Sequence, residues 1–153
     1  MIEVSVIIVT YQSENEILPC LTSIYEHTKG IGFEIIVIDN ASTDNTSNII
    51  RENFSNITLF QNKSNLGFSV GNNRAVSISK GKYIFFINPD TILIENSIKK
   101  LLGIYKTENN VGIIGPEIRN SDGSLQNSTG QLPNIYSTLY EAFGLYLFFP
   151  LSC

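Results

Sequence analysis

Short runs of β-branched and aromatic residues recur along this chain, and a segment with helical periodicity separates each run from the next. Apolar runs of this length are typical of strands that are buried on both faces of a sheet. The expected strands lie at residues 4–9, 33–38, 57–60, 83–87 and 111–114, with helices at residues 17–29, 45–54, 69–79 and 95–105. Because strands that alternate with single helices form right-handed crossovers, the sequence predicts an α/β fold with a mainly parallel sheet flanked by helices.

The chain of 153 residues is long enough for one domain with a substantial core, and its pattern changes after Gly115. Residues 115–125 are expected to form a hairpin that turns at residues 121–124. Residues 135–149 are expected to form an aromatic-rich helical segment, which is too short to cross a bilayer.

Polar side chains occur at the points where the expected strands end. They are Thr10 and Tyr11 after the first strand, Asp39 after the second, and Asn88 and Asp90 after the fourth. Ligands of open α/β sheets bind at the carboxyl ends of the strands. These side chains, together with residues 65–74, are therefore expected to form one binding site at this edge of the sheet.

Asp90 has two interpretations at this position. A carboxylate directly after a buried strand can hold Mg²⁺ or Mn²⁺ against the phosphates of a ligand. The same residue can instead cap the following helix, or complete a turn built on Pro89. In the first case, Asn88 would offer its amide to a ribose or phosphate oxygen.

Asp39, Arg74 and Tyr11 are open to similar pairs of interpretations. Asp39 can accept hydrogen bonds from a ribose or a base, or it can stabilise its own loop. Arg74 can face phosphates or a base, or it can be an exposed helix residue. Tyr11 can be a platform for a base or a packed aromatic. A nicotinamide-binding fold would need a glycine-rich turn after the first strand, and residues 10–16 contain no glycine.

Composition argues against several other classes of function. The formal net charge is −4 with only 10 Lys and Arg residues, which is unfavourable for a nucleic-acid-binding surface. With one histidine, His27, and two distant cysteines, Cys20 and Cys153, the chain cannot assemble a usual zinc site or a Ser-His-Asp triad. The cysteine usage and the lack of a basic segment before the first strand indicate a reduced, cytoplasmic setting.

Four stretches of the sequence carry a resemblance to a known family. They read VSVIIVTYQSENEILPCLTSI, EIIVIDNASTDNT, NKSNLGFSVGNNRA and YIFFINPDTIL, and a fifth, VGIIGPEIRNSDGSLQ, follows them. In this order and spacing they resemble the family-2 glycosyltransferases of the GT-A fold, especially the rhamnosyltransferase-like branch. The resemblance implies a nucleotide-sugar-binding GT-A core over residues 1–126. Residues 127–153 would be the start of the acceptor-side region.

The resemblance also implies a role for each candidate residue. Thr10 and Tyr11 would line the nucleotide pocket, Asp39 would bind the base, Arg74 would help to hold the nucleotide, Asn65 and Asn88 would contact the substrate, and Asp90 would be the metal ligand. The Asp-x-Asp motif of the family reads Asn88-Pro89-Asp90 here, so Asp90 is its only acid. Diphosphate oxygens and water would then complete the shell of the Mg²⁺ or Mn²⁺ ion.

The implied reaction transfers a sugar from a UDP- or dTDP-sugar to a hydroxyl of a glycan or lipid-linked acceptor in surface polysaccharide synthesis. It would proceed with inversion and with a divalent cation. Family members usually place the general base in the acceptor half, and no credible base follows Asp90 in this chain. The sequence therefore predicts the donor-binding half of such an enzyme, truncated before the full acceptor region. The alternative is a non-catalytic nucleotide-sugar-binding module or an inactive truncated enzyme.

Apolar residues near the end of the chain give a further expectation. Phe148, Phe149 and Leu151 would form an exposed patch that contacts a missing domain, another subunit or a membrane surface. The expected location is therefore the cytoplasm, either free or peripheral at the inner face of the membrane.

Overall fold

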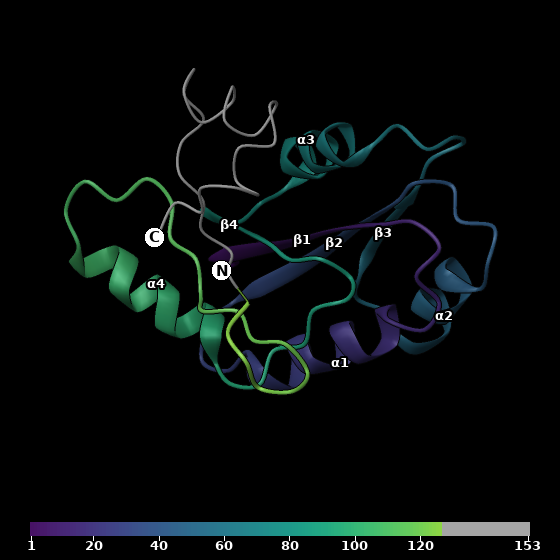
Figure 1. Ribbon diagram of the computed structural model, residues 1–153. Helices are drawn as coiled ribbons and strands as arrows, with labels where there is room; N and C mark the ends of the chain where they lie inside the picture. Colours follow the sequence, from purple (N-terminus) through teal and green to yellow (C-terminus); the bar gives the residue numbers. More distant parts are fainter. Residues whose placement is uncertain (127–153) are drawn as a thin grey trace, which may run out of the picture. The chain divides into compact units, whose positions relative to one another are not determined.

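The computed structural model of the protein describes residues 1–126, and these contain four strands and four helices. In chain order they are β1 (Val4–Thr10), α1 (Ile17–His27), β2 (Phe33–Asp39), α2 (Thr46–Asn53), β3 (Thr58–Gln61), α3 (Phe68–Ile78), β4 (Tyr83–Phe86) and α4 (Ser97–Thr107) (Figure 1). Strands and helices alternate as the sequence predicts, and the ends of these elements lie within two residues of the expected ones. The predicted α/β fold class is therefore confirmed.

All four strands are parallel, in the order β3-β2-β1-β4. β1 and β2 pair over their whole length, from Val4 beside Phe33 to Thr10 beside Asp39. β2 and β3 extend the sheet on one side of β1, and β4 pairs with the other side of β1. The strand order thus reverses between β1 and β4, and open α/β sheets bind ligands at the carboxyl ends of the strands beside such a reversal.

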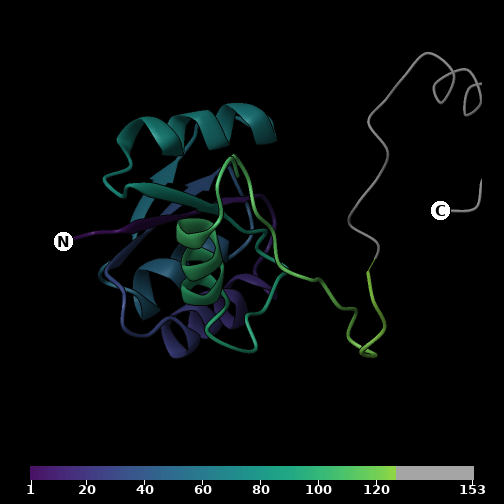
Figure 2. The ribbon, with the colours of Figure 1, turned by 90° about the vertical axis from the view of Figure 1, so that its left-hand side faces the viewer.

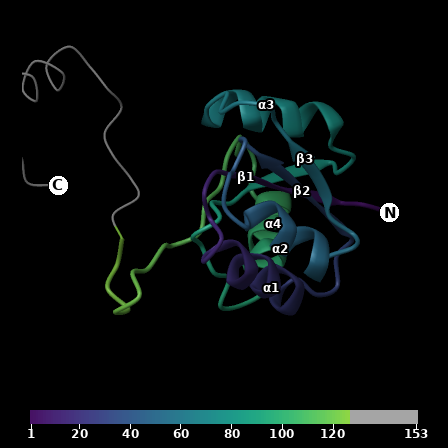
Figure 3. The same ribbon diagram turned by 90° about the vertical axis from the view of Figure 1, so that its right-hand side faces the viewer.

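Helices cover both faces of the sheet (Figures 2 and 3). α3 lies on one face, mainly over β1 and β2, while α1, α2 and α4 lie on the other. Alternate residues of β1 point to opposite faces of the sheet. Ile7 and Val9 pack with Ala75 of α3, whereas Val6 and Ile8 pack on the opposite side. Burial on both faces explains why β1 and β2 are continuous apolar runs in the sequence.

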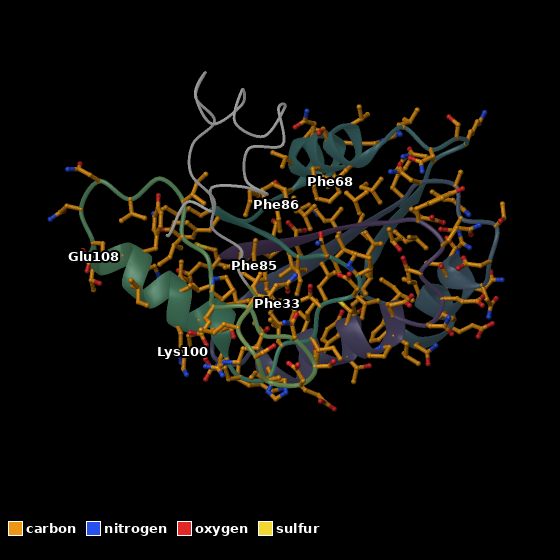
Figure 4. The ribbon with its side chains drawn as sticks, in the orientation of Figure 1. Phe33, Phe68, Phe85, Phe86, Lys100 and Glu108 are labelled. Atoms are coloured by element: carbon orange, nitrogen blue, oxygen red, sulfur yellow. The ribbon has the colours of Figure 1, made fainter. Side chains whose placement is uncertain are left out.

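β4 continues this alternation at an edge of the sheet. Phe85 packs against the core on the side of α1 and α4, and the next residue, Phe86, lies on the α3 side (Figure 4). Phe86 is 52% exposed because α3 lies mainly over β1 and β2. β4 is therefore covered less completely than β1.

Gly71 allows α3 to approach the sheet closely. A Cβ atom at this position would lie 2.9 Å from Cγ1 and 3.0 Å from Cγ2 of Val9, which is closer than ordinary van der Waals contact. Ile38 of β2 would also be in contact, at 3.6 Å. At Gly103 of α4, by contrast, an added Cβ atom would meet nothing within 4 Å among the described residues. Of these two helical glycines, only Gly71 occupies a position where a larger side chain would collide with the sheet.

The predicted strand at residues 111–114 is wrong for the part of the chain that the structure describes, since no strand is formed there. Asn110, directly before it, has a φ of +66°, which turns the chain. A strand needs a neighbour for its backbone hydrogen bonds, and within residues 1–126 none pairs with this segment. A run of four apolar residues does not by itself supply such a neighbour.

The predicted hairpin is confirmed around its turn. Arg119 pairs with Leu125 as an antiparallel bridge. The backbone amide of Asn120 donates to the carbonyl of Ser124 at 2.9 Å, and the amide of Gly123 donates to the carbonyl of Asn120 at the same distance. Gly123 has a φ of +83°, a conformation that glycine adopts without a steric cost.

The chain divides into two compact units, residues 1–114 and 115–153, and the hairpin belongs to the second. The functional division between residues 126 and 127 stays a prediction. The expected helical segment at residues 135–149 lies outside the described residues. Among the helices that the structure describes, none has both the length and the apolar character that crossing a membrane requires.

Candidate functional site

An open cleft lies at the carboxyl ends of β1 and β4, where the strand order reverses. Its volume is about 410 Å³, which is within the usual range for small-molecule sites. It is lined by residues from the end of β1, from the segment after β4 and from the start of α3. These residues are Val9, Tyr11, Gln12, Ser13, Glu16, Phe68, Asn88, Pro89 and Asp90.

Two exposed aromatic side chains belong to this lining. Tyr11 follows β1 and is 49% exposed. Phe68, which is labelled in Figure 4, begins α3 and is 59% exposed. An aromatic ring that is exposed in a cleft offers an apolar face on which a planar ligand group such as a nucleobase can stack. The cleft therefore combines stacking surfaces with the polar groups that follow β4.

The loop after β1 is fixed to the loop after β2 by the side chain and backbone of Gln12. Its Oε1 accepts hydrogen bonds from the backbone amides of Thr43 (3.0 Å) and Asp44 (3.1 Å), and the backbone amide of Gln12 donates to Ser42 Oγ (2.9 Å). Gln12 has a φ of +54°, which is uncommon outside glycine and persists where surrounding contacts hold the residue. This network fixes the backbone beside Tyr11.

Asp39 is fully buried, and its carboxylate accepts hydrogen bonds from the loop that follows it and from the start of α2. Oδ1 accepts from the backbone amide (3.0 Å) and the hydroxyl (2.5 Å) of Ser42, and Oδ2 accepts from Ser47 Oγ (2.5 Å). Ala41, within the same loop, has a φ of +65°. These contacts match the loop-stabilising interpretation of Asp39, and its contact with a base stays a prediction.

A chain of side-chain hydrogen bonds joins the ends of β2 and β3 to the start of α3. Arg74 Nη1 donates to Asn62 Oδ1 (2.6 Å), Asn62 Nδ2 donates to Asn40 Oδ1 (2.8 Å), and Asn40 Nδ2 donates to the carbonyl of Gly67 (3.2 Å). The guanidinium of Arg74 also lies 3.5 Å from the centroid of the Phe60 ring, a favourable cation–π contact. Arg74 is therefore held against β3 and does not line the cleft.

Thr10 and Asn65 also lie outside the cleft lining. Thr10 is 1% exposed, and its Oγ1 has no hydrogen-bond partner among the described residues. Asn65 is exposed, and its Oδ1 accepts a hydrogen bond from the backbone amide of Gly67 at 2.9 Å. The predicted contacts of Thr10 and Asn65 with a substrate stay predictions.

Asp90 lies in a turn with Pro89, after the end of β4. It does not cap the following helix, because α4 begins at Ser97 with Asn96 as its N-cap. Of the two structural interpretations, the turn is therefore the one that the structure retains. The Asp90 side chain is exposed and lines the cleft, which also keeps the metal-ligand interpretation open.

The loop that carries Asp90 packs against α1 through Cys20. Cys20 is fully buried, and its Sγ donates to the carbonyl of Asn88 at 3.5 Å. Burial raises the pKa of the Cys20 thiol to about 12, and the negative charge of Asp90 adds to the rise. The thiol therefore stays protonated at neutral pH and is a hydrogen-bond donor rather than a nucleophile.

Cys20 gives the stability of the protein a defined pH dependence. Since burial raises its pKa from the ordinary value of 9.0 to about 12, the unfolded chain loses the thiol proton first as the pH rises. The free energy of unfolding should keep this contribution below pH 9 and lose it between pH 9 and 12, falling by about 1 kcal/mol at pH 10. Urea denaturation at pH 8 and pH 10 measures the loss. The Cys20→Ala protein should lose correspondingly less, and an equal loss in both proteins would assign the effect to another group.

The oxygen atoms of the cleft suit a hard divalent cation that a ligand helps to hold. Asp90 and Glu16 contribute carboxylates to the lining, and Asn88 contributes an amide oxygen. Within residues 1–126, no group of three or more His, Cys, Asp or Glu side chains is placed to hold a metal ion. Mg²⁺ is commonly held by one or two carboxylates together with substrate phosphates. The residues present fit that arrangement, and not a cage made of protein ligands alone.

The cleft thus contains Tyr11, Asn88 and Asp90 from the residues that the sequence predicts. Sequence reasoning missed Gln12 and Glu16, and it included Phe68 only as part of the segment at residues 65–74. Gln12 and Glu16 could have been predicted from their positions after the first strand. Gln12 directly follows Tyr11, and Glu16 is the residue before α1. The sequence does not single out Phe68 within residues 65–74, because which side chain of that segment reaches the cleft depends on how α3 crosses the sheet.

The fold and the cleft together define a class of protein. A parallel sheet with helices on both faces, and with a cleft at the reversal of strand order, is characteristic of α/β proteins that bind nucleotides. The sequence profile of glycosyl transferase family 2 matches residues 5–150, and the chain belongs to this family. The family resemblance of the sequence stretches is thereby confirmed.

The chain is shorter than the relatives it matches. It is 34% identical over 119 residues to poly(ribitol-phosphate) beta-N-acetylglucosaminyltransferase TarP of Staphylococcus aureus, an overlap that covers 75% of this chain and 36% of TarP. The mannosyltransferase PcManGT from Pyrobaculum calidifontis, in complex with GDP-Man and Mn²⁺, is 25% identical with a TM-score of 0.65, covering 72% of this chain and 34% of that one.

A second solved structure has the same fold. S. aureus TarS 1-349, in complex with UDP-GlcNAc, has a TM-score of 0.63 at 23% identity, with 77% of this chain and 40% of that chain covered. The predicted GT-A-like architecture is confirmed by these neighbours. The described chain therefore spans about a third to two fifths of the length of TarP, PcManGT and TarS 1-349.

Proposed function

We propose that this chain is the donor-binding portion of a glycosyltransferase that acts in cell-surface polysaccharide synthesis. It would transfer a sugar from a nucleotide-sugar to a hydroxyl of a glycan or lipid-linked acceptor. The cleft at the reversal of strand order, with Tyr11 after β1 and Asp90 after β4, is the observation that carries the proposal. Membership of glycosyl transferase family 2, and the name of TarP as a poly(ribitol-phosphate) beta-N-acetylglucosaminyltransferase, support this chemistry and this kind of acceptor.

The proposed donor is a UDP- or dTDP-sugar. Its base stacks on the exposed ring of Tyr11, and Phe68 supplies a second apolar surface in the same cleft. Its diphosphate lies toward the segment after β4, where Asn88 donates from its amide. Thr10 and Asp39 at the ends of β1 and β2 are proposed to surround the nucleotide, together with Asn65 before α3 and Arg74 within it.

A divalent cation, Mg²⁺ or Mn²⁺, would offset the charge that develops on the departing nucleoside diphosphate. Asp90 is proposed to hold it, with the carboxylate of Glu16 in the same lining. The complex of PcManGT with GDP-Man and Mn²⁺ supports a cation of this kind.

We propose that transfer inverts the anomeric carbon by direct displacement. The acceptor oxygen forms its bond to that carbon while the bond to the diphosphate oxygen breaks, and a carboxylate takes the proton of the acceptor hydroxyl. No residue of the described chain is assigned as this base. The proposed location is the cytoplasm, free or at the inner face of the membrane, which accords with the cysteine usage.

Titration calorimetry of the 153-residue chain with UDP tests the proposal. We expect Mn²⁺ to strengthen UDP binding by about 100-fold relative to EDTA, because the cation neutralises diphosphate charge beside Asp90. Absence of binding of both UDP and dTDP at about 1 mM in Mn²⁺ would overturn it. Release of sugar from UDP-GlcNAc or another nucleotide-sugar would support catalysis, whereas binding with neither transfer nor hydrolysis would favour a non-catalytic donor-binding module.

A further inference from the structure

One turn of α1 contacts both ends of the loop at residues 88–93, which carries Asp90. Ser23 Oγ accepts a hydrogen bond from the backbone amide of Leu93 at 3.0 Å and donates to the carbonyl of Cys20 at 2.7 Å. Cys20 Sγ donates to the carbonyl of Asn88 at 3.5 Å. Because Cys20 and Ser23 are three residues apart, they lie on the same face of the helix and reach the two ends of one loop.

These contacts are made in the protein interior. Ser23 is 4% exposed, Cys20 is 0% exposed and Leu93 is 6% exposed. Water therefore cannot readily replace the hydroxyl of Ser23 as the acceptor for the Leu93 amide, and loss of this hydroxyl would leave a buried donor without a partner. The Ser23 contact is the stronger of the two, because a thiol is a weak donor.

The position of the Asp90 carboxylate depends on this loop. Between its two ends the loop is closed by a turn in which the amide of Thr91 donates to the carbonyl of Asn88 at 3.2 Å. The side chain of Asp90 is exposed, so packing of the side chain itself does not fix it. The backbone that α1 holds therefore sets where the Asp90 side chain leaves the loop.

We propose that Cys20 and Ser23 are positioning residues that hold Asp90 where metal-dependent donor binding requires it. This inference rests on the proposed function, since it assigns part of α1 to the support of the same site. Neither side chain lines the cleft. Both act through the loop, with Ser23 fixing its distal end and Cys20 its proximal end.

The test compares UDP affinity in saturating Mn²⁺ with UDP affinity in EDTA for the full 153-residue chain. Ser23→Ala should lower the ratio of these affinities by about tenfold, because the released loop no longer holds Asp90 in place. The affinity in EDTA should stay within about twofold, since the surfaces at Tyr11 and Phe68 are unchanged. Cys20→Ala should lower the ratio by about threefold, and Cys20→Ser, which keeps a donor, should restore most of it.

Ile24→Val is the matched control for general destabilisation. Ile24 neighbours Ser23 in α1 and is also buried, but its side chain makes no hydrogen bond to the loop. The shorter side chain in Ile24→Val should lower the melting temperature while leaving the ratio of affinities unchanged. An equal fall of the ratio in Ile24→Val and Ser23→Ala would overturn the proposal, because stability alone would then explain the effect.

Hydrogen exchange of the Leu93 amide reports on the loop without any ligand. Exchange of the Leu93 amide should be about tenfold faster in Ser23→Ala than in the wild type. In Ile24→Val, the exchange rate of this amide should change no more than the rates of other amides on the α1 side. Faster exchange with an unchanged affinity ratio would overturn the positioning role while the proposed function stands. Failure of the wild-type chain to bind UDP in Mn²⁺ would instead overturn the proposed function, and this inference with it.

Discussion

Replacing Asp90 with alanine should remove the Mn²⁺-dependent part of nucleoside-diphosphate binding and lower UDP affinity in Mn²⁺ by about 100-fold. The reason is that Asp90 is the only acid of the Asn88-Pro89-Asp90 motif and lines the cleft beside the end of β4. Affinity in EDTA should change little. The fold should survive because the Asp90 side chain is exposed, and an unchanged melting temperature would verify this.

Two further variants make this result specific to a carboxylate at this position. Asp90→Asn keeps the size of the side chain but removes its charge, and it should bind UDP nearly as weakly as Asp90→Ala. Glu95→Ala removes another exposed carboxylate, which pairs with Lys100, and it should leave UDP affinity within about twofold. If Asp90→Ala retained full Mn²⁺-dependent affinity, Asp90 would be left with its turn role alone.

Replacing Gly71 with valine should lower the free energy of unfolding by about 3 kcal/mol. The new Cβ atom would lie 2.9 Å from Cγ1 of Val9, in the layer where α3 contacts β1, so the helix must move away from the sheet. Urea denaturation measures the change. UDP affinity should fall as well, because Val9 lines the cleft and Phe68 lies at the start of the same helix.

Gly103→Val is the matched control, since it introduces the same side chain into another helix. The Cβ position of Gly103 has open space within 4 Å among the described residues, so the change in unfolding free energy should be within about 0.5 kcal/mol. A similar loss at both glycines would attribute the effect to β-branching in a helix instead of to close packing of α3 on β1.

The order of strands and helices in the chain could be predicted because each element leaves a local pattern. β1 and β2 are buried on both faces, and their unbroken apolar runs follow directly from that burial. The failure at residues 111–114 has the opposite cause. An apolar run becomes a strand only where another strand accepts its backbone hydrogen bonds, and a single sequence does not state where that partner lies.

The candidate site could be predicted to the level of the sheet edge but not to the level of side-chain contacts. Tyr11 and Asp90 line the cleft because strand ends alone place them there. Asp39 and Arg74 are expected at the same edge, yet their polar atoms are held by Ser47 and Asn62 respectively. Such pairings join residues that are 8 and 12 positions apart, and they depend on how two loops pack rather than on any local pattern.

The hydrogen-bond chain through Asn40, Asn62 and Arg74 restricts which sequences can keep this arrangement. Asn40 and Asn62 are buried, and each amide both donates and accepts within the chain. A change at one position would leave a polar atom of the next without a partner. Among sequences that share this packing, the three positions should therefore covary, with any replacement arising as a matched set.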